Sequence, residues 1–142
     1  MKKHERIVEL ARQFAVEGVD ARYAGYFALF NQGNFYEAHD VLEDLWLADR
    51  HGPNGNFYKG LIQLAGAFVH LQKNRLQPAL ALFGLARRNL QPFPALHEHL
   101  HVPGLLAMID DWSGELQSGD IARNPLSVRG GPKVQLATRE AR

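Results

Sequence analysis

Apolar residues recur at helical spacing along most of the chain, and this pattern predicts a succession of amphipathic helices. Within residues 4–17 the apolar side chains repeat every three or four positions, with polar residues between them, so that one face is apolar. The same pattern, interrupted by glycine, asparagine or proline, predicts five further helices over residues 21–32, 35–49, 57–73, 77–90 and 103–117. Residues 95–103 are expected to be irregular or weakly helical. The sequence therefore predicts an all-α fold.

The segment 57–73 differs from the other predicted helices because it is apolar nearly all round. A helix of this kind is typical of the buried centre of a bundle. Before the last turn its polar side chains are Lys59, Gln63 and His70. At helical spacing these three residues form one narrow polar stripe on an otherwise apolar helix.

A weak internal repeat relates two parts of the chain by a shift of 41 residues. Phe27 aligns with Phe68, and the expected turn residue Gly33 aligns with Asn74. Each copy contains a helix, a tight turn and a second helix. The pattern predicts a bundle of five to six helices built on two stacked, tetratricopeptide-like helical hairpins.

The length of 142 residues suits one domain with a substantial core. Hydrophobic residues make up 46% and charged residues 22%, as in ordinary globular proteins. Residues 119–142 are rich in glycine, arginine, serine and proline. We predict a single helical domain over residues 1–118, followed by an extended C-terminal tail over residues 119–142.

Charge and cysteine content narrow the range of functions. The net charge of +1 gives no general attraction to nucleic acid or to anionic membranes, so neither partner is expected. The most apolar stretch, residues 61–71, is about half the ~20 residues of a membrane-spanning helix, and a cytoplasmic protein is expected. Cysteine is absent, which excludes disulfides, thiolate zinc sites and cysteine nucleophiles within this sequence.

The predicted helix 35–49 carries an ionisable pair, His39 and Glu43, one turn apart and beside Trp46. This spacing brings two side chains to within about 5–6 Å on one helix face. It suits a pair of metal ligands, a histidine oriented by a carboxylate for general base work, or a structural hydrogen-bond network. The residues do not identify a cofactor.

The repeat suggests where this pair points. His39 and Glu43 align with Leu80 and Gly84, which are apolar or small. We therefore expect the pair to lean inward and to be hydrogen-bonded, because an unsatisfied buried polar group costs about 1–3 kcal/mol. The stripe on helix 57–73 is the nearest expected source of partners. The candidate cluster is His39, Glu43, Trp46, Lys59, Gln63 and His70.

A second group of histidines, His97, His99 and His101, lies in the irregular segment. In an extended conformation the three side chains share one side, where they would bind zinc or nickel adventitiously. The alternative is a solvated loop.

Two segments carry a resemblance to a known family. The stretch FNQGNFYEAHDVLEDLW over residues 30–46 and the stretch GLIQLA over residues 60–65, followed by His70 and the turn at Asn74, resemble the domain-of-unknown-function family 309. The resemblance implies an all-helical fold with a short extended tail, here residues 132–136. The activity of this family is not established.

Two functions of different classes follow from these patterns. The first is an interaction or scaffold module that binds a protein partner or a second copy of itself as a homodimer. The second is an enzyme or a protein that binds a small ligand or metal through His39, Glu43, Gln63 and His70.

Overall fold

The computed structural model describes residues 1–118 and 124–137 of the chain. It is mostly helical, with a single small two-stranded sheet among the described residues, which confirms the predicted all-α fold. The elements are α1 (Lys3–Arg12), α2 (Ala21–Asn31), α3 (Phe35–Asp49), α4 (Gly55–Gln72), α5 (Leu76–Leu90), β1 (Leu96–His97), β2 (Leu100–His101), α6 (Val102–Gln117) and α7 (Pro125–Arg129). Within the described residues, no helix is both long enough and apolar enough to cross a membrane.

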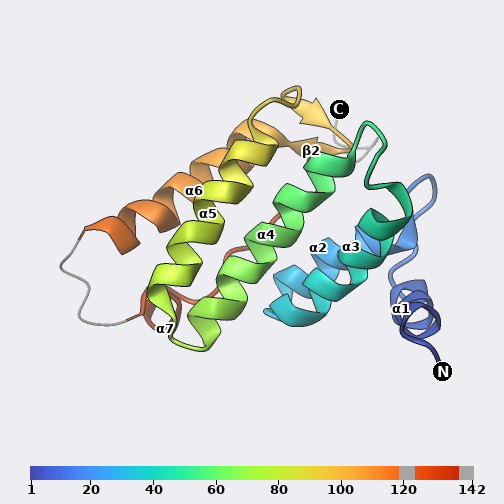
Figure 1. Cartoon of the computed structure of the whole chain (residues 1–142), viewed down its shortest axis with the longest axis horizontal. Helices are drawn as coiled ribbons and strands as arrows, with labels where there is room; N and C mark the ends of the chain where they lie inside the picture. Colours follow the sequence, from blue (N-terminus) through green and yellow to red (C-terminus); the bar gives the residue numbers. More distant parts are fainter. Residues whose placement is uncertain (119–123, 138–142) are drawn as a thin grey trace.

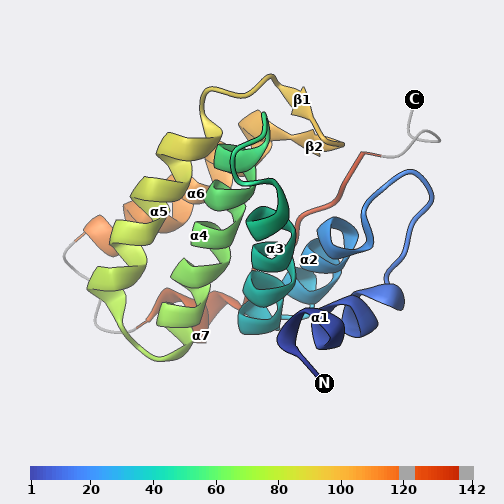
Figure 2. The same ribbon diagram turned by 45° about the vertical axis from the view of Figure 1, so that its right-hand side comes forward.

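The helices pack as consecutive pairs, α2 with α3 and α4 with α5 (Figure 1). The helix α4 lies between α3 and α5, and ten of its eighteen residues are buried. This confirms the central position predicted from its apolar surface. The helix α6 covers α5, and α1 covers the opposite end of the bundle beside α2 and α3 (Figure 2).

The turns of the two helix pairs have the same backbone geometry, as the internal repeat predicts. Gly33 and Asn74, which the repeat aligns, both have positive φ angles, of 81° and 57°. At the first turn the N–H of Gly33 donates to the carbonyl of Phe30, and the N–H of Asn34 donates to the carbonyl of Leu29. At the second turn Asn74 donates to Leu71 and Arg75 donates to His70 with the same spacing of three and five residues. Both helices therefore end in a Schellman motif.

The core centres on Phe68 of α4, whose side chain is fully buried. Its ring centroid lies 4.9–5.5 Å from four aromatic rings, each from a different helix: Phe30 of α2, Phe35 of α3, Phe83 of α5 and Trp112 of α6. Most of these pairs meet edge to face, an arrangement favoured by the ring quadrupoles. One side chain thus joins five helices.

Two tyrosines of α2 are also part of this core. The hydroxyl of Tyr26 donates a hydrogen bond of 2.6 Å to the carbonyl of Leu61, and Tyr23 donates one of 2.6 Å to the carbonyl of Glu98. Burial raises the pKa of Tyr26 well above its usual value, and burial also raises the pKa of Tyr23. Both phenols must keep their proton in the folded state.

We predict that the free energy of unfolding falls as the pH rises above about 10, where an unfolded tyrosine begins to lose its proton. The folded-state pKa of Tyr26 is raised, so its contribution is complete below the unfolded pKa and is lost as the pH rises toward the folded one. Urea unfolding between pH 8 and 11 measures the slope. Tyr26→Phe should reduce the slope, to which Tyr23 also contributes, whereas Tyr36→Phe, which changes an exposed side chain, should leave it unchanged.

Two segments of the helical body differ from the prediction. The first helix ends at Arg12 rather than at residue 17, and a single antiparallel bridge joins Val16 to Val19. The segment 95–103 contains the two short antiparallel strands β1 and β2. The turn between these strands places both Glu98 and His99 at positive φ. A two-residue hairpin turn of type I′ has positive φ at both positions, a conformation usual for glycine or asparagine, so Glu98 and His99 give no sequence signal for it.

The predicted tail is only partly described, since residues 119–123 and 138–142 lie outside the described residues. Its described part begins with the short helix α7, which was not predicted. Asn124 is buried and its side chain donates to the carbonyl of Leu71 at the end of α4. Arg129 forms ion pairs with Asp111 and Glu115 of α6. The described part of the tail therefore packs on the helical body.

Candidate functional site

The outer side of α3 gathers most of the ionisable side chains near the predicted pair. The sequence of α3 contains five acidic residues and no lysine or arginine: Glu37, Asp40, Glu43, Asp44 and Asp49. The helix α1 lies across part of this side (Figure 2). Cations on α1 and α2 therefore approach an acidic helix.

His39 and Glu43 do face one another, with 4.0 Å between Nε2 and Oε2. Their side chains are 31% and 32% exposed, so the pair lies at the surface rather than leaning inward as predicted. Nδ1 of His39 lies 3.2 Å from Asp40. Lys3 of α1 donates to Glu43 at 3.5 Å and lies 3.9 Å from Asp40. The polar partners of the pair thus come from α1 and from α3 itself.

The polar residues of α4 have other neighbours. Lys59 is exposed. Gln63 accepts a hydrogen bond of 2.7 Å from Asn89 of α5. His70 is half-buried, and its Nδ1 has no hydrogen-bond partner among the described residues. Across the described part of the chain, no hydrogen bond or ion pair joins Lys59, Gln63 or His70 to the pair on α3. Trp46 is partly buried and packs against the core.

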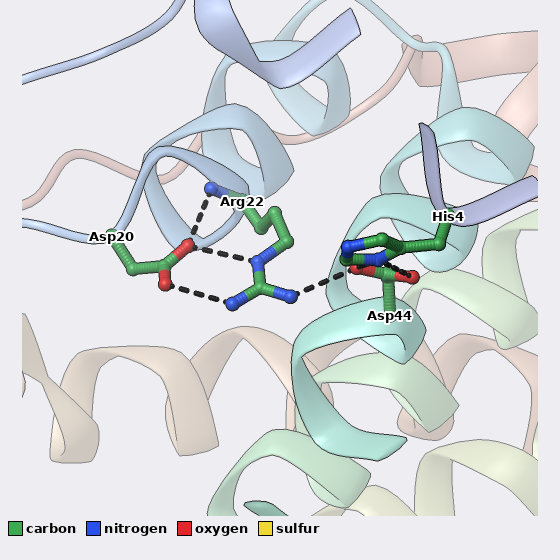
Figure 3. Close-up of polar contacts among 4 residues, drawn as sticks. All are labelled: His4, Asp20, Arg22 and Asp44. Carbon is green, nitrogen blue, oxygen red and sulfur yellow. Dashed lines mark hydrogen bonds and ion pairs between the residues drawn. The ribbon is translucent and has the colours of Figure 1, made fainter. Parts of the chain in front are cut away.

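A second network centres on Asp44 of α3 (Figure 3). Its side chain is only 13% exposed, because Arg22 of α2 and His4 of α1 cover it. Arg22 donates to Asp44 at 2.8 Å, and Nδ1 of His4 lies 2.8 and 2.9 Å from the two carboxylate oxygens. One carboxylate thus joins three helices.

Arg22 also holds Asp20, the N-cap residue of α2 (Figure 3). It donates to Asp20 through Nε at 3.1 Å and Nη2 at 3.0 Å. The hydrogen bond from Arg22 lowers the pKa of Asp20, and the same bond raises the pKa of Arg22. Both groups are therefore kept charged, and Arg22 forms a bridge between two carboxylates.

No sequence signal identifies His4 or Asp44 as members of one network. Forty residues separate them, and their contact depends on how α1 docks on α3. The amphipathic pattern of α1 predicts that one face is buried, but it does not state which helix it meets.

The chemistry of this region is that of ion pairing. The acids Asp20, Asp40, Glu43 and Asp44 each lie within 4.0 Å of a cationic side chain. Among residues 1–118 and 124–137, no group of three or more histidine or acidic side chains is arranged to hold a metal ion. His39 and Glu43 thus form part of an ion-pair network at the surface of α3.

The three histidines of the irregular segment make separate contacts. Nε2 of His97 lies 2.7 Å from Oδ1 of Asn54. His101 is the N-cap residue of α6, and its Nδ1 accepts from the N–H of Gly104 at 3.2 Å. The side chain of His99 is exposed on the turn between β1 and β2. The hairpin turn thus prevents the shared arrangement expected for an extended segment.

The outer side of α3 also exposes two large hydrophobic side chains, which sequence reasoning did not single out. Tyr36 is 58% exposed and Leu47 is 55% exposed. The ring of Tyr36 stacks beside His39, with 6.4 Å between the ring centroids. The signal was available, because an apolar residue on the polar side of an amphipathic helix contradicts the pattern of the other positions.

Comparison with known proteins gives one match. The family described as Domain of unknown function (DUF309) matches residues 23–82. No curated protein and no solved structure matches the chain. The matched residues include α3, α4, both Schellman turns and most of α2. The resemblance seen in the sequence is thus confirmed, because the DUF309 family model matches residues 23–82 of this chain.

Proposed function

We propose that this protein is a helical interaction module and that it binds a protein partner through the outer face of α3. The name α3 outer face is used here for Tyr36, His39, Glu43 and Leu47. The observation that carries the proposal is the exposure of Tyr36 and Leu47, at 58% and 55%, on either side of an ionisable pair. Large apolar side chains beside polar groups are typical of protein interfaces.

The spacing of these residues makes one continuous surface. At 100° per residue, Tyr36, Glu43 and Leu47 fall within about 40° of one another, and His39 lies at their edge. Tyrosine contributes a large contact area at a small cost in conformational entropy. The tyrosine ring beside His39 is thus suited to the centre of a contact.

The charge of α3 indicates the kind of partner. Its five acidic residues are offset only in part by Lys3, His4 and Arg22. A partner segment with lysine or arginine beside apolar residues complements this face, and such complementarity favours association over competing contacts. A basic amphipathic helix has this chemistry.

The second function considered, an enzyme or small-ligand protein, has less support. It requires His39 and Glu43 to act together with Gln63 and His70. Glu43 contacts Lys3 of α1, His39 contacts Asp40 and Glu43 of its own helix, and Gln63 contacts Asn89 of α5. No polar contact in the described part of the chain connects the two sets.

A titration with a peptide probe tests the proposal. The probe is a helical peptide with leucines on one face and lysines on the other, and the charge control replaces every lysine with glutamate. In ¹⁵N–¹H spectra of the whole chain, the basic peptide should shift the amide resonances of residues 36–47 saturably, and the acidic peptide should not.

Matched variants locate the contact. Combined Tyr36→Ser and Leu47→Ser substitutions should abolish the shifts, whereas Leu96→Ser, at a residue that is 62% exposed on β1, should leave them unchanged. Shifts that lie elsewhere, or that are the same with the acidic peptide, would contradict the proposal. Sedimentation of the free protein, measured alongside, separates self-association through the same face from binding to another protein.

A further inference from the structure

The described end of the tail lies on the helical body as an extended segment. This segment, residues 131–137, is called the strap below. Every second side chain is half-buried, at Pro132, Val134 and Leu136, and the residues between them are exposed. Val134 and Leu136 pack against the core. From α7 the strap runs behind α4 toward the strands β1 and β2 (Figure 1). This alternation of half-buried and exposed side chains is typical of an extended peptide that lies with one face against its receptor.

The helical body also forms hydrogen bonds to the backbone of the strap. Asn31, the last residue of α2, donates from Nδ2 to the carbonyl of Val134 at 2.8 Å. Its Oδ1 accepts the N–H of Val134 at 2.7 Å. The N–H of Ala137 donates to the carbonyl of His99 at 2.7 Å. The carboxamide of Asn31 thus bonds both the N–H and the C=O of one residue, and these bonds do not depend on the side chain of that residue.

The strap does not fill the groove in which it lies. A cleft of about 290 Å³ remains between the strap and α6. Leu105, Met108 and Trp112 of α6 line one side, and Pro132 and Val134 of the strap line the other. An occupant with larger apolar side chains at these two positions would bury more surface in the same groove.

We propose that this groove is a binding site for an extended segment of a partner protein, and that the strap occupies it when the partner is absent. The segment carries apolar residues at every second position. At the positions of Pro132 and Val134 its side chains are larger than proline and valine. The residue held by Asn31 has a free N–H and is therefore not proline. This surface is separate from the α3 outer face, so each proposal is tested independently of the other.

The strap competes with any such partner because it belongs to the same chain. A segment tethered by a short linker has an effective concentration in the millimolar range. A free peptide identical to the strap should therefore bind weakly to the native protein. A peptide that fills the cleft better, or a chain whose strap is weakened, should show binding clearly.

The test uses two labelled heptapeptides and the full chain. One peptide has the strap sequence GPKVQLA, and the other has phenylalanine in place of the valine. A variant with Val134→Asp and Leu136→Asp, called the released variant, should have a strap that no longer packs against the core. Fluorescence anisotropy measures peptide binding to this variant and to the native chain. Both peptides should bind the released variant saturably, the phenylalanine peptide severalfold more tightly, and both should bind the native chain more weakly.

A matched pair of substitutions tests the backbone grip. In the released variant, Asn31→Leu removes two hydrogen bonds and should weaken peptide binding roughly tenfold or more. Asn89→Leu makes the same change on α5, where the side chain bonds to Gln63, and should leave the affinity unchanged. Loss of affinity to the same extent in both variants would overturn the role given to Asn31.

A measurement on the native chain covers the case in which the released variant does not fold. With the phenylalanine peptide in excess, the amide resonances of Val134 and Ala137 should move toward the values of an unbound segment. Circular dichroism reports whether the released variant keeps its helices. No displacement in the native chain, together with no binding to a folded released variant, would overturn the proposal.

Discussion

Replacing Phe68 with alanine is expected to lower the free energy of unfolding by about 3–5 kcal/mol. The side chain is fully buried and contacts aromatic rings from α2, α3, α5 and α6. Its loss leaves a cavity that five helices border, and they cannot all move in to fill it without losing other contacts. For a domain stable by about 5–15 kcal/mol, this is a large fraction of the total.

Urea unfolding followed by circular dichroism measures the effect. Tyr36→Ala is the control, because it also removes an aromatic ring from a helix but one that is mostly exposed. It should change the free energy of unfolding by no more than about 0.5 kcal/mol. A loss below about 1 kcal/mol for Phe68→Ala would show that the core closes around the missing ring.

Replacing Gly60 with valine is expected to destabilise the fold by about 2–3 kcal/mol. A Cβ at Gly60 would lie 2.8 Å from Cγ of Leu90 and 3.2 Å from Cβ of Asn89, both on α5. Leu90 is fully buried, so it has little freedom to move. The added atoms must therefore push α4 and α5 apart along their contact.

Gly84→Val on α5 is the matched control, because a Cβ at Gly84 would meet no atom within 4 Å. It should leave the free energy of unfolding within about 0.5 kcal/mol of the native value. Thermal and urea unfolding of both variants compare the two sites directly. Equal effects at the two glycines would mean that the change in helix propensity, and not the close approach of α4 and α5, determines the cost.

The helices α1 to α6 were predictable because each has a local cause in the sequence. The spacing of apolar residues set their positions, and the alignment of Gly33 with Asn74 predicted two equivalent turns. The central place of α4 followed from its lack of a polar face. In each case the information lies within one helix or in the comparison of two similar stretches.

The surroundings of the candidate pair were not predictable in the same way. Helical spacing brought His39 and Glu43 together, but the partner Lys3 lies on α1, and the direction in which α1 docks has no local signature. The same holds for Asp44, whose position on α3 is a matter of helical spacing alone. Helical spacing does not show that His4 and Arg22 cover Asp44. The strap was expected to be extended, yet three apolar residues in alternation are too short a pattern to predict where it binds.

The hydrogen bonds between Asn31 and Val134 join residues that are 103 positions apart, whereas the helix pairs form from neighbouring segments. Closing a long loop has an entropic cost that contacts between neighbouring segments largely avoid, so such contacts form late in folding. Chains are also synthesised from the N-terminus, at about 5–20 residues per second. We therefore expect the helical pairs to assemble while Val134 is still unmade or unattached. For that interval each newly made molecule presents an empty groove, which is the moment when another protein meets the least competition for it.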